Sequence, residues 1–121
     1  MNSSDNLRLA DYLRHILQAI HRIQEYTSDI DEIAFLQDQR TQDAVIRNFE
    51  VIGEASNNIN KRYPDFVDQH PEIPLVIAYE MRNALTHGYF KVDIPIVWRT
   101  IELDLPQLEK QVSRLQASLT Q

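Results

Sequence analysis

A chain of 121 residues can bury one continuous core but is too short to divide easily into two, so residues 1–121 are predicted to form a single domain. The chain has no cysteine, which excludes disulfides, thiolate zinc sites and cysteine nucleophiles and favours a reducing compartment, the cytoplasm. A formal net charge of -6 argues against a general nucleic-acid binder, although a small local site needs only a few well-placed cations.

The hydrophobic pattern predicts an all-α protein, because no window alternates apolar and polar residues as a half-buried strand does. The first helix is predicted from about Ser4 to Tyr26. Its apolar residues recur at three- and four-residue spacing, namely Leu9, Leu13, Ile16, Leu17, Ile20 and Ile23. A short helical piece from Ile30 to Leu36 follows within an acidic, solvated stretch. No stretch approaches the roughly 18 apolar residues of a membrane span, and no basic start precedes an apolar run, so neither export nor membrane insertion is expected.

The next helix is predicted from about Asp38 to Arg62, with one apolar face and an end just before Pro64. Gly53 lies inside this helix, where a glycine costs about 1 kcal/mol of helix stability relative to alanine. We interpret it as a place where another backbone packs closely, with no part in chemistry. The stretch from Pro64 to Pro71 is predicted to be a loop.

A further helix is predicted from about Glu72 to His87, ended by Gly88, which readily adopts the left-handed conformation of a helix cap. The last helical region starts near Asp93, a good N-cap residue, and Pro106 should kink or split it. The expected fold is therefore a compact bundle of four to five helices whose last helix is kinked at Pro106.

The polar side chains at the end of the 72–87 helix differ from those of a helix surface that has only a structural role. On a helical wheel Arg82, Asn83 and His87 share the arc opposite a core stripe. An imidazole can exchange a proton near neutral pH, a guanidinium can hold two phosphate oxygens, and an amide can orient either partner. These groups suit metal-free RNA cleavage, in which a ribose 2′-hydroxyl attacks the neighbouring phosphorus. From residue types alone, a surface histidine stabilised by the helix dipole is the more common explanation.

The string from Arg82 to Tyr89 resembles the Arg, four to six residues, His signature of HEPN-domain ribonucleases, and more narrowly the HepT toxin family, whose motif ends in His-x-Tyr. The resemblance covers nearly the whole chain. Its other landmarks are the Gly-Glu-Ala helix within residues 47–55, the Val92 to Trp98 stretch, and Asp104-Leu105-Pro106.

This resemblance implies the toxin of a toxin–antitoxin system that cleaves RNA, in some cases transfer RNA, without a metal or cofactor. Arg82 and His87 would be catalytic and Asn83 would support them. The partner would be a minimal nucleotidyltransferase of the MntA type, which silences the toxin by attaching AMP to Tyr89. A homodimer would place the composite active site in a cleft between protomers. The alternative is a catalytically silent HEPN interaction module that binds a nucleotide or docks a nucleotidyltransferase.

The other histidines have simpler interpretations. Asp11 and His15 stand one turn apart, which metal ligands can do, but an ordinary helix-surface pair is favoured. His21 is expected at the surface or an interface, and His70 in a loop. The polar cluster from Asn57 to Arg62 either contacts RNA phosphates or polarises the helix C-terminus, and we favour the second interpretation.

Overall fold

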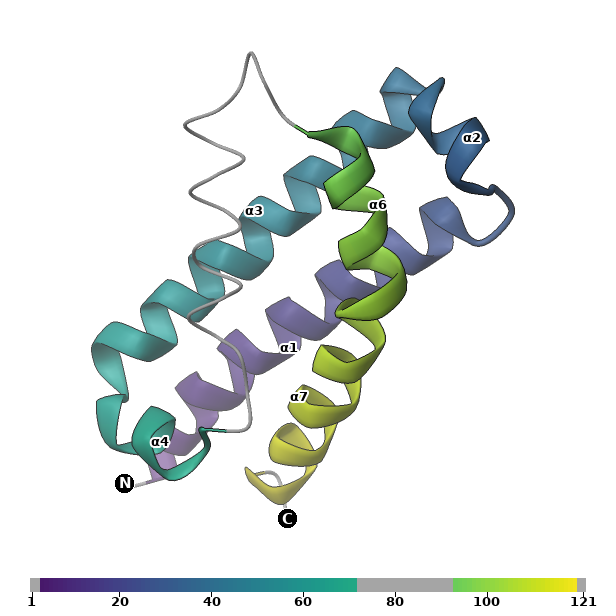
Figure 1. Ribbon diagram of the computed structural model, residues 1–121. Coiled ribbons are helices and arrows are strands. Elements are labelled where there is room, and N and C mark those ends of the chain that lie inside the picture. The colour runs from purple at the N-terminus through teal and green to yellow at the C-terminus, as the bar shows by residue number, and fades with distance from the viewer. Residues whose placement is uncertain (1–2, 72–92, 120–121) are drawn as a thin grey trace.

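The computed structural model describes residues 3–71 and 93–119, and within these ranges every regular element is an α-helix (Figure 1). The all-α prediction is therefore confirmed. The helices of the described ranges are α1 (Ser3–Thr27), α2 (Glu32–Leu36), α3 (Gln39–Arg62), α4 (Pro64–Gln69), α6 (Ile94–Leu103) and α7 (Leu105–Leu119).

The two long helices α1 and α3 lie side by side and antiparallel, while α7 packs along another side of α1 and α6, which precedes α7, lies beside α2 (Figure 1). The most extensive packing is between α1 and α3, and the next is between α1 and α7. The short helices sit at opposite ends, with α2 beside the start of α3 and α4 beside its end. Helix α1 is thus the central element of the described bundle.

The core forms along the apolar stripe that the sequence predicts for α1. Five side chains of this stripe are completely buried, namely Leu9, Leu13, Ile16, Ile20 and Ile23. Each such aliphatic side chain stabilises the fold by about 1.5–3 kcal/mol relative to full exposure. None of the described helices combines the length and the apolar content needed to cross a bilayer.

Helix α3 contributes Val45, Phe49, Ile52 and Ile59 to the same core, and Gly53 between them is buried. A side chain at position 53 would occupy space inside the packed face. This burial agrees with the interpretation of Gly53 as a packing residue.

Aspartates cap three of the described helices. Asp31, Asp38 and Asp93 accept hydrogen bonds from the backbone N–H groups three residues later, at 2.9, 3.1 and 3.2 Å. The predicted N-cap at Asp93 is confirmed, and because Asp31 caps α2 that helix begins at Glu32 and not at Ile30. Hydrogen bonds from the Thr41 hydroxyl and backbone N–H hold the pKa of the Asp38 carboxyl below its ordinary value.

The prediction of a loop from Pro64 to Pro71 is wrong, because residues Pro64–Gln69 form helix α4. A proline in the first turn of a helix loses no hydrogen bond, and its fixed φ suits the start of a helix. Phe66 then anchors the short helix by burying its ring in the core. Tertiary burial, which local sequence does not reveal, favours the helix here.

The predicted break in the last helical region is confirmed, but it lies at Asp104, two residues before Pro106. The N–H of Asp104 still donates to the Thr100 carbonyl at 3.0 Å and closes α6. Pro106 then occupies the first turn of α7, where its missing N–H is tolerated. With α4 and this division, the described residues hold six helical segments where four to five helices were expected.

Phe35 should dominate the attachment of α2. Its ring is completely buried and lies 5.2 Å from the Trp98 ring of α6, centroid to centroid. Phe35→Ala is expected to lower the free energy of unfolding by about 3–5 kcal/mol, because it leaves a cavity between α2 and α6. Ile33→Ala on the same helix is the matched control, since Ile33 is 68% exposed and should change stability by less than about 0.5 kcal/mol. Urea denaturation followed by circular dichroism measures both, and equal effects would contradict the packing described.

Candidate functional site

The motif residues Arg82, Asn83, His87 and Tyr89 lie outside the described residues, as does the predicted helix that carries them. The described helices hold both ends of that segment. On one side α4 ends at Gln69 and the ring of its C-cap residue His70 lies 4.7 Å from the Phe66 ring. On the other side Asp93 caps α6. The scaffold therefore sets where the motif segment leaves and rejoins the bundle.

The remaining landmarks of the sequence can be placed. In the Gly53-Glu54-Ala55 string of α3, Gly53 and Ala55 are buried and Glu54 is exposed. On α6, Trp98 is buried against Phe35. Leu105, in the Asp104-Leu105-Pro106 string, is only 2% exposed. Gly53, Ala55, Trp98 and Leu105 are therefore core residues, whereas Glu54, Asp104 and Pro106 face solvent.

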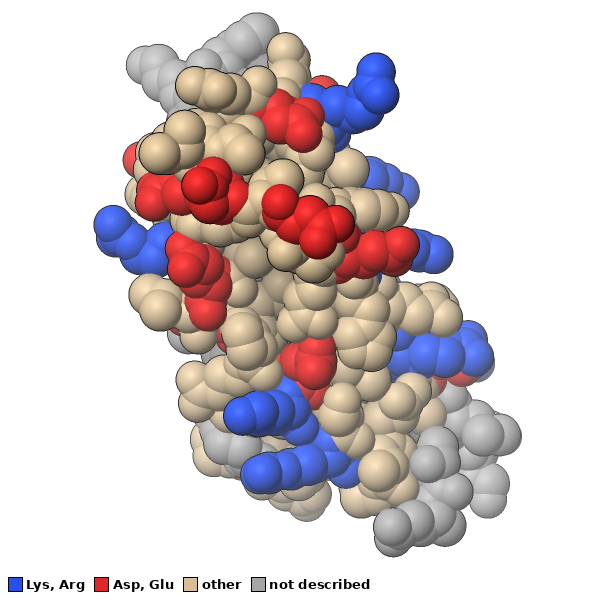
Figure 2. All heavy atoms as spheres, turned by 90° about the vertical axis from the view of Figure 1, so that its right-hand side faces the viewer, with Lys and Arg blue, Asp and Glu red and all other residues tan. Residues whose placement is uncertain are grey.

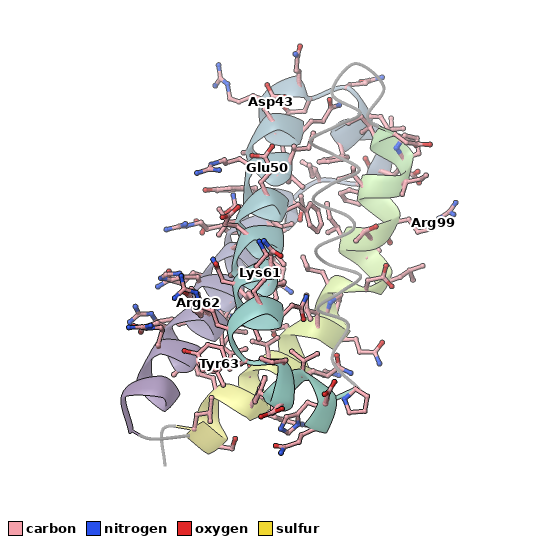
Figure 3. The ribbon with its side chains drawn as sticks, turned by 90° about the vertical axis from the view of Figure 1, so that its left-hand side faces the viewer. Asp43, Glu50, Lys61, Arg62, Tyr63 and Arg99 are labelled. Carbon is pink, nitrogen blue, oxygen red and sulfur yellow. The ribbon has the colours of Figure 1, made fainter. Side chains whose placement is uncertain are left out.

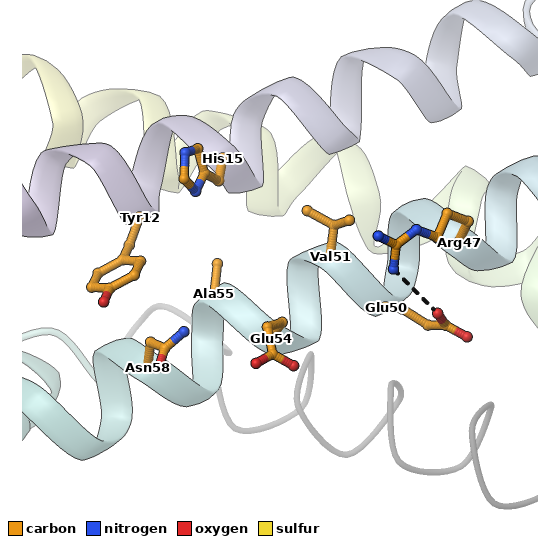
Figure 4. A pocket seen from close by; sticks show the side chains of 8 residues that line it. All are labelled: Tyr12, His15, Arg47, Glu50, Val51, Glu54, Ala55 and Asn58. Carbon is orange, nitrogen blue, oxygen red and sulfur yellow. Dashed lines mark ion pairs between the residues drawn. The ribbon is translucent and has the colours of Figure 1, made fainter.

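A cavity of about 400 Å³ opens between α1 and α3. Its walls come from both helices: α1 supplies Tyr12 and His15, and α3 supplies the rest (Figure 4). The α3 residues that line it are Arg47, Glu50, Val51, Glu54, Ala55 and Asn58. Tyr12, Val51 and Ala55 point into the space between the helices and make an apolar floor. Polar groups then surround that floor.

The charges of the cavity are unevenly placed. Arg47 pairs with Glu50 one turn later on α3, at 3.6 Å between Nη1 and Oε2, with its side chain 74% exposed. Figure 4 shows both Glu50 and Glu54 on the side of α3 that is farther from α1, whereas Arg47 lies on the near side. An exposed pair of this kind contributes little to stability, so the guanidinium is available to a ligand. The α1 side of the cavity has no carboxylate in its lining.

Tyr12 and Arg47 carry no local signal of a site in the sequence, and His15 was expected to form an ordinary helix-surface pair with Asp11. Residues 12–15 and 47–58 come together only when α1 packs against α3, so no local sequence motif indicates the cavity. Asp11, the proposed companion of His15, instead pairs with Arg14 at 3.2 Å. Within residues 3–71 and 93–119, no group of three or more His, Cys, Asp or Glu side chains is arranged to hold a metal ion.

The structure also places the two remaining described histidines and the basic residues at the end of α3. His21 is exposed on α1 and lies 3.6 Å from the Glu109 carboxylate of α7, so it belongs to the surface as expected. His70 is the C-cap of α4 and begins the non-helical stretch after Gln69, so it lies outside the helix as expected. Lys61 and Arg62 lie in the last turn of α3, where cations interact favourably with the helix dipole.

Comparison with known proteins identifies relatives along most of the chain. The sequence model of the ribonuclease HepT-like family matches residues 16–115. A protein of Thermococcus cleftensis named "Probable ribonuclease HepT" is 46% identical over 105 residues, which is 87% of this chain and 93% of that protein. A protein of Caldanaerobacter subterraneus subsp. tengcongensis is 38% identical over 104 residues, covering 86% of this chain and 90% of the relative.

A third relative shows the same region within a longer protein. It comes from Methanocaldococcus jannaschii, is 38% identical over 108 residues, and covers 89% of this chain but 47% of that protein. Its name joins a gamma-glutamylcyclotransferase to a "putative RNase", and the Caldanaerobacter relative is also named a "putative RNase". No solved structure matches the chain.

Tyr12 should act in the cavity wall through its ring and not through its hydroxyl. Its ring meets that of Tyr63 edge to face with centroids 6.5 Å apart, and its hydroxyl bonds to no other residue of the described ranges. Tyr12→Leu is expected to lower the free energy of unfolding by about 0.5–1.5 kcal/mol through loss of the aromatic contact. Tyr12→Phe, the matched control, should stay within about 0.5 kcal/mol of wild type in urea denaturation. A larger loss in the phenylalanine variant would show that the hydroxyl has a structural role.

Proposed function

The chain belongs to the HepT-like ribonuclease family, and on that premise we propose that it is a metal-independent endoribonuclease and the toxin of a toxin–antitoxin pair. The observation that carries this proposal is the extent of the family match, from residue 16 to residue 115. That range includes the whole string from Arg82 to Tyr89. Membership supports RNA as the substrate class, with transfer RNA as a candidate within it.

In the proposed reaction, His87 takes the proton of a ribose 2′-hydroxyl as its oxygen attacks the adjacent phosphorus. Arg82 holds the nonbridging oxygens, on which negative charge grows, and Asn83 orients the imidazole or donates to a phosphate oxygen. The bond from phosphorus to the 5′-oxygen breaks, and that oxygen takes a proton. The products are a 2′,3′-cyclic phosphate and a 5′-hydroxyl, and no step requires a metal.

The reaction needs a base for the 2′-hydroxyl and an acid for the leaving oxygen, and each chain has one motif histidine. Two chains related by a two-fold axis would supply both groups in one cleft. We therefore include a homodimer with a composite active site in the proposal. The alternative, a catalytically silent interaction module, draws support from the net charge of -6 and is the hypothesis that the next experiment can favour.

Replacing His87 tests the catalytic assignment. With labelled RNA in EDTA, His87→Ala should cleave roughly 10²- to 10⁴-fold more slowly than wild type, because general acid-base groups contribute that much. His21→Ala is the matched control, since His21 is an exposed histidine paired with Glu109, and its rate should equal that of wild type. Circular dichroism should be the same for all three proteins. If purified wild type leaves RNA intact in EDTA, the ribonuclease proposal fails and the silent module is favoured.

Tyr89 is the proposed position of control by the antitoxin. The transferase would join the phenol oxygen of Tyr89 to the α-phosphorus of ATP with release of pyrophosphate, adding negative charge beside the site where RNA phosphate must bind. After co-expression with the partner transferase, peptide mass spectrometry should locate AMP on Tyr89 and find none in Tyr89→Phe. Peptides containing Tyr12 and Tyr26 serve as internal controls and should stay unmodified. AMP on another tyrosine, or none beside an active transferase, would contradict the assignment.

A further inference from the structure

The cavity between α1 and α3 continues into a basic groove along both helices. On α1, Arg8, His15 and Arg22 follow one another at seven-residue spacing. Seven residues are close to two helical turns, so these side chains share one side of α1 and recur about every 10 Å. Because Tyr12 and His15 line the cavity shared with α3, this is the side of α1 that borders α3.

Helix α3 offers a matching row. Arg40 and Arg47 are also seven residues apart, and Arg47 lies on the side of α3 near α1. Figure 3 shows Arg62 reaching from the end of α3 toward α1, while Lys61 faces outward. Since the two helices are antiparallel, Arg62 lies toward the Arg8 end of the groove and Arg47 toward Arg22. Cations from both helices therefore flank the groove, with Glu50 and Glu54 at the outer edge of α3.

These cations are exposed and mostly uncompensated. Arg8, Arg22 and Arg62 are exposed and make no ion pair with another described residue, whereas the exposed Arg40 interacts electrostatically with the Asp38 carboxylate. Arg47 has the weak pair with Glu50 as its sole described carboxylate partner. Exposed cations of this kind repel one another, and a ligand that supplies negative charge at repeated intervals would relieve that repulsion.

Within the groove the carboxylates Glu50 and Glu54 lie at the edge of α3 that is farther from α1, and a second group of acidic residues lies on another face of this chain of net charge -6. Asp and Glu side chains cover the upper and middle part of the face formed by α2 and α6 (Figure 2). Exposed members of this set are Asp29, Asp31, Glu32, Glu102 and Asp104. A polyanion would be repelled from that face and directed to the α1–α3 side.

The groove also contains an aromatic ring. Tyr12 lies on its floor beside His15 and one helical turn after Arg8 in the sequence, and the edge contact with Tyr63 holds the ring in place. Rows of cations interleaved with an aromatic platform are typical of surfaces that bind single-stranded nucleic acid, because the cations hold phosphates while a base stacks on the ring. An acidic peptide would use the cations but would have no use for a stacking platform.

We infer that the α1–α3 groove is a binding site for single-stranded RNA, separate from the motif residues and serving to hold the substrate. This inference rests on the proposed function, because RNA is the substrate assigned there. Phosphates contact Arg8, Arg22, Arg47 and Arg62, and a base stacks on Tyr12. The site contributes affinity for long substrates and takes no part in the chemical step.

Direct binding tests the groove. The probe is a 2′-O-methylated single-stranded RNA of about 12 nucleotides, which cannot be cleaved through a 2′-hydroxyl. Its affinity for full-length wild type is measured by fluorescence anisotropy at several salt concentrations. The groove variant combines Arg22→Gln, Arg47→Gln and Arg62→Gln. The matched control combines Arg99→Gln, Lys110→Gln and Arg114→Gln, which removes the same charge from exposed positions on α6 and α7.

For single strands each lost phosphate contact reduces the magnitude of the slope of log K against log salt by about 0.7. Loss of three contacts should therefore reduce the slope of the groove variant by about 2 and weaken its binding at least roughly ten-fold. The control variant should keep the wild-type slope and affinity. Equal effects of the two variants would overturn the inference, because only net charge would then matter. Unchanged RNA binding together with loss of the nucleotidyltransferase partner would also overturn it and mark the groove as a protein interface.

Cleavage assays separate this inference from the proposed function. With long RNA the groove variant should raise KM about ten-fold and leave kcat unchanged, whereas cleavage of a dinucleotide should match wild type. If wild type cleaves RNA and the groove variant binds as tightly as wild type, the groove is overturned and the ribonuclease stands. If wild type cleaves no RNA but the groove variant still binds more weakly, the groove stands without the enzyme. A wild type that neither binds nor cleaves overturns both.

Discussion

The rest of the described structure depends on the burial of one stripe of α1. Leu9, Leu13, Ile16, Ile20 and Ile23 are wholly excluded from solvent, and they are covered on one side by α3 and on the other by α7. A helix that buries its apolar face against two neighbours has a fixed rotation about its axis, because any turn would expose aliphatic surface at a cost of about 25 cal/mol per Å². The direction of every other side chain on α1 follows from that rotation. Arg8, Tyr12, His15 and Arg22 come to border α3 for this reason.

The same constraint explains how a net acidic protein can have a basic surface. Once the buried stripe fixes the rotation of a helix, the position of each charged residue in the sequence decides which face of the bundle it occupies. The α1–α3 side receives arginines from both helices together with Asp43 and Glu50 of α3, and the face formed by α2 and α6 carries a further group of carboxylates (Figures 2 and 3). For a protein that handles RNA, such separation matters more than total charge, because phosphates respond to the local field within a Debye length of about 10 Å.

In the proposals, a short segment of the chain cleaves RNA and two long helices bind it. The Arg82 to Tyr89 string supplies the groups for bond cleavage and for control by AMP. The long helices provide a rigid frame, since α4 and α6 hold the two ends of the motif segment and α1 and α3 offer a surface for more distant parts of the substrate. In this arrangement loss of binding in the groove need not disturb the reacting groups. The family match over residues 16–115 spans both parts.

The sequence by itself determined the helical class, the buried stripe of α1, the N-cap at Asp93 and the family, because helical periodicity, capping and motif strings are local and can be read in one dimension. It located a break near Pro106 but not its position at Asp104, and it missed α4, since a six-residue helix is stabilised by the burial of Phe66 and not by its own propensity. The roles of Arg82, Asn83, His87 and Tyr89 stay predictions from the sequence. Only the tertiary structure joined Tyr12 and His15 to Arg47 and Asn58 in one cavity, because residues more than thirty positions apart become neighbours only when two helices pack.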